Sequence, residues 1–325
     1  MLFRSQFHRV DYLGVAYADE GVALRKNGIT LPIMVLNPSL DSFELCKTYN
    51  LEPEIYSFEM LDRLLAYFKQ SGECFDDFKL HIKLDTGMRR LGFLPQEVPR
   101  LAKTLADNLP QEVRVMSVFS HLAGADEDKH NDFSRHQINT FQVCTHLIEA
   151  SLGYSFLRHI ANSPAITRFP EAHFDMVRLG IGLYGVEASN LYPNSLANVA
   201  TFKTVISQIK TVLAGETVGY GRQGLATQAS TIATIAVGYA DGFLRKLSKG
   251  RGKVGIRGQL APIIGNVCMD MCMADITGIA AQEGDEVVIF GQYPTLEMLA
   301  EALETIPYEV LTNVSERVQR IFYTE

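Results

Sequence analysis

Short apolar segments alternate with amphipathic segments through the first half of the chain. The apolar segments are rich in β-branched and aromatic residues, whereas the segments between them repeat apolar residues at helical spacing. The apolar segments are YLGVA (12–16), PIMVLN (32–37), EIYSF (54–58), LHIKLDT (80–86), RVMSVFSHLA (114–123), FLRHIANSP (156–164) and MVRLGIGLYG (176–185). Strand–helix alternation predicts a parallel sheet covered by helices. These seven predicted strands are one fewer than a closed (β/α)8 TIM barrel needs.

The pattern changes after about residue 190. TFKTVISQIKTV, STIATIAVGYA, GKVGIRGQLAPIIG and DEVVIFG read as strands joined by glycine-rich turns, which predicts an antiparallel β domain. One late helix, around 296–306, places Leu296, Leu299, Ala300 and Leu303 on a single face. We therefore expect two domains, residues 1–190 and 191–325.

The stretch HIKLDTGMRRLGF, residues 81–93, places charged residues in an otherwise buried strand. Side chains alternate along a strand, so Leu80, Ile82 and Leu84 share one face and His81, Lys83 and Asp85 the other. If the apolar face meets the helices, Lys83 points into the barrel near Arg90. Two poorly solvated cations side by side are costly. Either an acid or a chemical change at Lys83 offsets that cost, or Asp85 pairs with Arg90 and Lys83 reaches water.

Composition narrows the class of protein. The chain has 325 residues, 47% of them hydrophobic, and a formal net charge of −7. Nothing in it forms a basic surface for nucleic acid or an anionic membrane. No apolar run approaches the length of a membrane span. The five scattered cysteines suit free thiols in a reducing cytoplasm, and no spacing of Cys and His predicts a metal site.

Two later strand ends carry further candidate residues. RHIANSPA ends one strand with His159, Asn162 and Ser163, and FDMVRLGIGLYG carries Arg178 and Gly180. A serine hydroxyl, backbone amides at a glycine turn and a helix N-terminus are features of phosphate sites.

Seven segments together resemble the pyridoxal-phosphate-dependent alanine racemases. These are KLDTGMRRLGF, ANSPA, FDMVRLGIGLYG, GETVGYG, GYADGF, GNVCMDMCM and PYEVLTNVSERVQR, in the family's order along nearly the whole chain. The segment QFHRVDYLGVAYADEGVALRKNGIT looks especially like the corresponding segment of Bacteroidetes-type members. Some of these are fused behind a peptidoglycan ligase domain. The resemblance implies a TIM barrel, a β domain, a head-to-tail homodimer and D-alanine synthesis for peptidoglycan.

The resemblance also assigns roles to single residues. Lys83 matches a lysine that is often carbamylated, which would turn the buried ammonium into an anion that holds Arg90. Arg90 matches the contact to the substrate carboxylate, and His159 matches the imidazole beside the cofactor ring. Arg178 matches the donor to the pyridine nitrogen. The phosphate cradle is matched by Ser163, Gly180, Ile181 and Tyr308.

Catalysis in this family needs a base on each face of the α-carbon. Tyr220 matches one base, supplied by the partner subunit together with the substrate-side residues Met269 and Asp270. The other base is the Schiff-base lysine on the first strand, and no counterpart of it is found in this chain. The only lysines before residue 69 are Lys26 and Lys47, in other sequence contexts. With the missing eighth strand, this predicts a chain that begins one strand–helix unit late and is inactive alone.

Three functions stay open from the sequence. The first is an alanine racemase that interconverts L- and D-alanine by a two-base mechanism on a pyridoxal phosphate aldimine. The second is a fold-related decarboxylase, although the glycine-rich phosphate loops and cysteine context of those enzymes are not found. The third is a catalytically incompetent fragment or pseudoenzyme.

Overall fold

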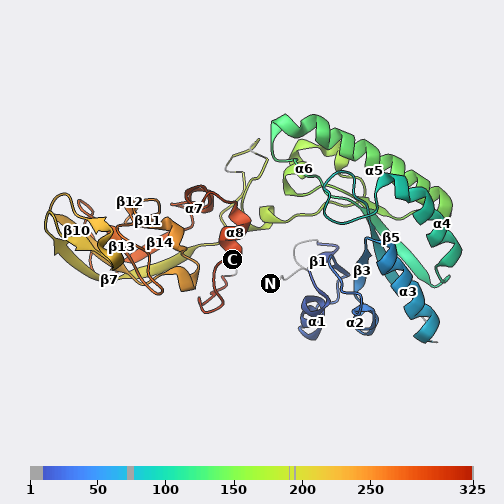
Figure 1. Ribbon diagram of the computed structural model, residues 1–325, viewed down its shortest axis with the longest axis horizontal. Helices are drawn as coiled ribbons and strands as arrows, with labels where there is room; N and C mark the ends of the chain where they lie inside the picture. The colour runs from blue at the N-terminus through green and yellow to red at the C-terminus, as the bar shows by residue number, and fades with distance from the viewer. Residues whose placement is uncertain (1–9, 72–76, 190, 194, 324–325) are drawn as a thin grey trace. The chain divides into compact units, whose positions relative to one another are not determined.

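The computed structural model describes residues 10–71, 77–189, 191–193 and 195–323. The chain divides into two compact units (Figure 1). Unit 1 comprises residues 1–179 and 188–191, and unit 2 comprises residues 180–187 and 192–325. The predicted boundary at residue 190 stays a prediction about independent domains.

Unit 1 is built on six parallel strands in the order β1-β2-β3-β4-β5-β6, each paired with the next one along the chain. Their bounds are β1 Leu13–Val15, β2 Ile33–Val35, β3 Glu52–Ile55, β4 Phe78–Lys83, β5 Val113–Phe119 and β6 Leu157–His159. The connecting helices are α1 Ala18–Lys26, α2 Phe43–Thr48, α3 Phe58–Ser71, α4 Val98–Asn108 and α5 Asn131–Leu152, and α6 Ser163–Arg168 follows β6. Figure 1 shows α1 to α5 on the outside of the strands. This sequence-adjacent parallel order gives a barrel-like unit.

The predicted seventh strand is wrong. Residues 176–179 form no strand, and Ile181–Tyr184 form a 3₁₀ helix. Gly185 follows it with φ +83°, a left-handed conformation that ends the helix. The segment still runs beside β6, because Arg178 donates its amide to Ala161 O over 3.0 Å and Asp175 donates to Arg158 O. An extended apolar segment can thus line a sheet without joining its hydrogen-bond ladder.

The predicted alternation along β4 is confirmed. Leu80, Ile82 and Leu84 are at most 1% exposed and belong to the main hydrophobic cluster of the unit. His81 and Lys83, on the other face, meet polar or aromatic groups of neighbouring strands. The helices therefore cover the apolar face, and the polar face turns to the interior of the barrel-like sheet.

Unit 2 contains the predicted antiparallel sheet, in the order β12-β11-β14-β7-β10-β13. The strands are β7 Phe202–Val212, β10 Ser230–Ile235, β11 Lys253–Ile256, β12 Gln259–Pro262, β13 Cys272–Asp275 and β14 Glu286–Phe290, with a small hairpin of β8 Thr217–Val218 and β9 Gly224–Leu225. Two helices follow, α7 Leu296–Leu303 and α8 Pro307–Thr312. All four residues predicted on the apolar face of α7 are buried. In the part of the chain that the structure describes, no helix combines the length and apolar character needed to span a membrane.

Candidate active site

Polar side chains gather where β3 to β6 of unit 1 end. The carboxyl ends of parallel strands lie at one edge of the sheet, and barrel enzymes place their chemistry there. β4 ends at Lys83 and β6 at His159, and Arg178 lies beside β6. The sequence prediction that these three residues share one site is consistent with this placement, and Arg178 contacts His159 directly.

Lys83 is a buried amine that rests on an aromatic ring. It is 8% exposed, and Nζ lies 4.2 Å from the centroid of the Phe119 ring. Burial lowers the pKa of Lys83 to about 8, and the negative charge of Glu54 partly opposes that shift. An amine with such a pKa is partly neutral near physiological pH, which makes it a nucleophile. The alternative that Lys83 reaches bulk water does not fit this burial.

Glu54 is a site residue that the sequence analysis missed. Its side chain is 1% exposed, and Oε1 has no hydrogen-bond partner. Burial raises the pKa of Glu54 to about 7, although Lys83, Arg178 and Arg90 favour the ionised form. Strand alternation could have identified it. Glu54 lies opposite His81 of β4, so its side chain points with those of His81 and Lys83 to the interior.

The turn after β4 is held by Asp85, not by an Asp85–Arg90 ion pair. Asp85 Oδ1 accepts the amides of Gly87 over 2.8 Å and Arg89 over 3.0 Å. Arg89 adopts φ +58°, a left-handed conformation unusual for a residue other than glycine. Arg90 is exposed, and among the described residues no hydrogen bond or ion pair fixes it. The guanidinium is thus available to an anionic ligand.

Arg178 is fixed from several directions. Its NH1 donates to Nδ1 of His159 over 2.6 Å, and its NH2 donates to the carbonyl of Ser120 over 2.6 Å and to that of Ile160 over 3.2 Å. NH2 also lies 3.3 Å from Nδ1 of His121. Within the described ranges, Nε has no hydrogen-bond partner. Burial lowers the pKa of Arg178 to about 10, so it stays charged at neutral pH.

Both histidines beside Arg178 are neutral. His159 is fully buried and stacks on Phe119, with centroids 4.7 Å apart and planes 5° apart. Burial, reinforced by the charge of Arg178, holds the pKa of His159 well below its usual value. The same two causes, in the same order, lower the pKa of His121 to about 3. The contact of His121 with Arg178 adds this histidine to the site.

The predicted phosphate residues are partly brought together. Ile181 donates its amide to the hydroxyl of Tyr308 over 2.9 Å, and both residues belong to unit 2. Gly180 precedes Ile181 in the same unit. Ser163 opens α6 in unit 1. The Ile181–Tyr308 bond therefore supports two members of the cradle, while the place of Ser163 in it stays a prediction.

Tyr220 stands at the tip of a glycine-flanked turn in unit 2. Gly219 and Gly221 on either side have φ +76° and +66°, and the carbonyl of Tyr220 accepts from Asn266 Nδ2 over 3.0 Å. A Cβ at Gly219 would lie 2.7 Å from Met273 Cε. The Tyr220 ring is 71% exposed and borders a cavity of about 400 Å³. The turn thus presents the phenol outward.

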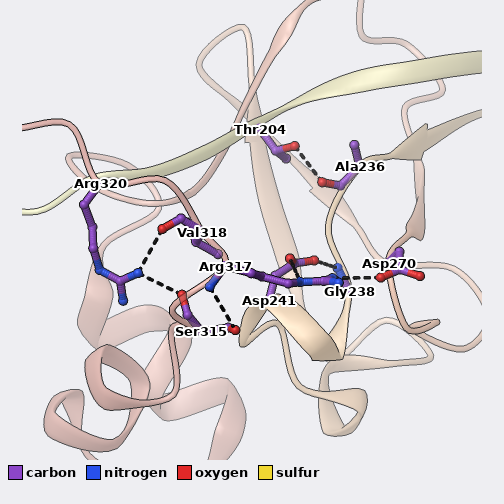
Figure 2. A network of polar contacts seen from close by, with 9 residues as sticks. All are labelled: Thr204, Ala236, Gly238, Asp241, Asp270, Ser315, Arg317, Val318 and Arg320. Carbon is purple, nitrogen blue, oxygen red and sulfur yellow. Dashed lines mark hydrogen bonds and ion pairs between the residues drawn. The ribbon is translucent and has the colours of Figure 1, made fainter.

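Asp270 is held by an arginine that the sequence analysis did not single out. Figure 2 shows Arg317 between two carboxylates: Nε donates to Asp241 Oδ1 and NH2 to Asp270 Oδ1, each over 2.8 Å. Asp241 also accepts the amide of Gly238 over 2.9 Å. Met269 beside Asp270 is 54% exposed. The two predicted substrate-side residues therefore lie on an exposed loop whose acid is oriented.

A barrel-like parallel unit that carries buried cationic residues at its strand ends, followed by an antiparallel β unit, is the architecture of a barrel enzyme with an appended β domain. Comparison with known proteins narrows this class. The family model described as "Alanine racemase, N-terminal domain" matches residues 3–188, and "Alanine racemase, C-terminal domain" matches residues 199–322. The chain belongs to the alanine racemase family.

Individual relatives agree with this assignment. An alanine racemase of Clostridium tetani is 39% identical over 95% of this chain and 81% of its own length. The crystal structure of alanine racemase from D-cycloserine-producing Streptomyces lavendulae has a TM-score of 0.91 and 32% identity, and the match covers 99% of this chain and 85% of that one. A Bartonella henselae alanine racemase, described with covalently bound pyridoxal phosphate, has a TM-score of 0.87 and 29% identity over 98% of this chain and 86% of that one. Because the N-terminal model matches from residue 3, the comparisons do not support the expected absence of a first strand–helix unit.

Proposed function

We propose that the protein interconverts L-alanine and D-alanine with pyridoxal 5'-phosphate as cofactor, and so supplies D-alanine for peptidoglycan. Arg178 carries the proposal. It is a charged guanidinium whose terminal nitrogens are committed to His159 and to backbone carbonyls, which leaves Nε for a ligand. Membership in the alanine racemase family supports the same reaction.

The residues fit two of the three parts of the cofactor. Arg178 suits the pyridine nitrogen, and the Ile181–Tyr308 pair, with Gly180 and Ser163, suits the phosphate. Neither of the two described lysines before residue 69 fits as the covalent anchor: Lys26 lies exposed in the last turn of α1, and Lys47 lies in the last turn of α2. Polar contacts alone would therefore hold the cofactor in this chain.

When bound, pyridoxal phosphate withdraws electrons from the α-carbon of the amino acid. Around it, Arg178 donates to the pyridine nitrogen and keeps its own proton, because a guanidinium is not deprotonated in proteins. Arg90 binds the substrate carboxylate, and the buried His159 holds Arg178 in place by accepting from NH1. The Tyr220 hydroxyl moves a proton on one face of the α-carbon, with Met269 and Asp270 on the substrate side.

The reaction is tested on residues 1–325 with added pyridoxal phosphate, by following D-alanine formed from L-alanine. With one base absent, we expect slow turnover that rises when methylamine is added, because a small amine can replace a missing lysine amine. Methylamine should give no rise in a Tyr220→Phe variant. Fast turnover without amine, with a borohydride-fixed adduct at Lys26 or Lys47, would overturn the anchor assignment; no D-alanine under any condition would count against the reaction.

We infer further that two copies of the chain share their sites. Tyr220, Met269 and Asp270 are all strongly exposed on unit 2, which suits service at the barrel of a second copy. Mixed dimers of Tyr220→Phe and Arg90→Ala should regain part of the activity that each variant has lost. Mixed dimers that form and stay as inactive as their parents would contradict shared sites.

We also propose that Lys83 is carbamylated. Its pKa of about 8 provides neutral amine, and carbon dioxide adds to that nitrogen as an N–C bond forms and a proton leaves. A carbamate signal in ¹³C NMR after incubation with ¹³C-bicarbonate, absent in Lys83→Met, tests this.

The Bacteroidetes-type subgroup stays a prediction. A reducing, cytoplasmic location is supported by free thiols at Cys46, Cys144, Cys268 and Cys272.

A further inference from the structure

A continuous chain of hydrogen bonds crosses the interior of unit 1 and ends at Arg178. Glu52 Oε2 lies 2.9 Å from His81 Nε2, and His81 Nδ1 lies 2.6 Å from Ser117 Oγ. Ser117 Oγ lies 2.9 Å from His159 Nε2, and His159 Nδ1 accepts from Arg178 NH1 over 2.6 Å. Each link joins neighbouring segments, from β3 through β4, β5 and β6 to residue 178.

For neutral histidines and an ionised Glu52, the two ends of this chain fix every proton between them. A guanidinium can only donate, so His159 Nδ1 must carry the lone pair and Nε2 the proton. His159 then donates to Ser117, which donates to His81 Nδ1. His81 therefore carries its proton on Nε2 and donates to Glu52, whose carboxylate can only accept. One arrangement of neutral histidines satisfies all four bonds.

We propose that Glu52 is a positioning residue that fixes the tautomer of His81 and, through the Ser117 hydroxyl, the orientation of His159 against Arg178. This goes beyond the proposed function, and it relies on that function only for the role of Arg178 towards the cofactor. Glu52 lies on the first residue of β3 and does not take part in the contacts of Arg178 itself.

Burial makes the arrangement obligatory. Glu52 is 4% exposed, and His81, Ser117 and His159 are 0% exposed, so water does not offer alternative partners. An unpaired buried donor or acceptor destabilises a protein, because it has lost its hydrogen bonds to water without gaining others. Tyr12 strengthens the acceptor end, because its hydroxyl donates to the same Glu52 oxygen over 2.9 Å and its ring meets His81 edge-on at 5.9 Å. A reversed tautomer anywhere would leave one such group unpaired.

The wild-type chain gives the first test without any substitution. ¹⁵N NMR of histidine-labelled protein distinguishes a protonated ring nitrogen from one with a lone pair. We expect His81 and His159 each to show the proton on Nε2 and none on Nδ1. A proton on Nδ1 of either histidine would overturn the proposal.

Substitutions test whether a change at Glu52 reaches His81 and His159. Glu52→Leu removes the acceptor and should mix the tautomers of His81. His159 should keep its proton on Nε2, because Arg178 still donates to Nδ1, but its Nε2 signal should shift as the Ser117 hydroxyl changes partner. Glu52→Gln, which retains an oxygen acceptor, should preserve the signals of both histidines. Ser117→Ala removes the hydroxyl that joins the two rings and should shift the ¹⁵N signals of His81 Nδ1 and His159 Nε2, which covers the case that Glu52→Leu does not fold. The matched control is Ser134→Ala, because Ser134 is a fully buried serine whose hydroxyl has no partner.

The second measurement is the affinity of each variant for pyridoxal phosphate, determined by absorbance titration. Glu52→Leu and Ser117→Ala should bind it about tenfold more weakly, the equivalent of one hydrogen bond to a charged group. If His159 stays unchanged in folded Glu52→Leu and Ser117→Ala, the proposal is wrong. If the wild-type chain does not bind the cofactor, the proposed function fails while the NMR result still decides the tautomers.

Discussion

The backbone amide of Ile181 donates to the hydroxyl of Tyr308 over 2.9 Å, although 127 positions separate the two residues in the sequence. Ile181 opens the 3₁₀ helix that replaces the predicted seventh strand, and Tyr308 lies in the first turn of α8. The bond therefore ties the segment after Gly180 to the C-terminal helix of unit 2.

Removing this hydroxyl should weaken the hold on the cofactor phosphate. Tyr308→Phe leaves the Ile181 amide without its acceptor, and a typical hydrogen bond is worth about 1 kcal/mol. We expect the dissociation constant for pyridoxal phosphate to rise about fivefold, measured by absorbance titration. Tyr293→Phe, in an equally exposed tyrosine of unit 2, should leave it unchanged. Equal effects of the two variants would argue against the cradle.

Glu54 predicts a pH dependence of stability. Its folded pKa of about 7 lies above its ordinary value of 4.5. Stability from the protonated carboxyl is therefore fully present below about pH 4.5 and lost as pH rises through 7. Glu54→Gln lacks this loss, so over the same interval it should gain stability relative to wild type, on the order of 3 kcal/mol.

Urea unfolding at pH 4.5 to 8 measures this difference. Glu171→Gln, which changes an exposed carboxylate, serves as the control and should follow the wild-type curve. Parallel curves for wild type and Glu54→Gln would show that folding does not raise the pKa of Glu54, because Lys83 and the two arginines offset its burial.

Gly238 sits under the loop that carries Met269 and Asp270. A Cβ there would lie 2.2 Å from the carbonyl oxygen of Met269 and 2.4 Å from that of Cys268. Both carbonyls are backbone and accept amides of the 238–242 turn, so they cannot move independently. We expect Gly238→Ala to lower the free energy of unfolding by about 3 kcal/mol and to raise the KM for alanine. Thermal unfolding and initial rates measure the two effects.

Gly14→Ala is the matched control for this substitution. A Cβ at Gly14 meets only Leu36 Cδ1, at an ordinary 3.5 Å. If Gly238→Ala is no less stable than Gly14→Ala, the loop yields more easily than its contacts indicate.

Arg317 should orient Asp270 without contributing much to overall stability, because its ion pairs are solvent-exposed. Arg317→Lys keeps the charge but loses the planar fork that reaches two carboxylates. We expect faster hydrogen exchange in residues 266–273 and a KM that rises severalfold with kcat nearly constant. Arg320→Lys is the control, because Arg320 donates only to nearby backbone carbonyls (Figure 2). Unchanged exchange in Arg317→Lys would show that the loop holds its shape alone.

The sequence by itself determined the family and the elements other than the segment 176–185. Alternation along β4 separated Leu80, Ile82 and Leu84 from His81 and Lys83, because successive side chains of any strand face opposite ways. Helical spacing likewise identified the buried face of α7. Motifs such as GETVGYG could be recognised because a backbone with positive φ favours glycine. Gly219 and Gly221 both adopt such a conformation.

Only the tertiary structure decided which residues contact one another across distant segments of the chain. An apolar segment such as 176–185 is equally compatible with a strand and with a loop along a sheet. In the fold, the Arg158 amide donates to the Asp175 carboxylate and not to a backbone carbonyl of this segment, a choice that periodicity does not reveal. Glu52 and Glu54 look like ordinary surface acids, and burial in the barrel interior is what makes one the end of a hydrogen-bond chain and raises the pKa of the other. The Ile181–Tyr308 and Arg317–Asp270 contacts join distant segments, and sequence periodicity reports only on neighbours along the chain.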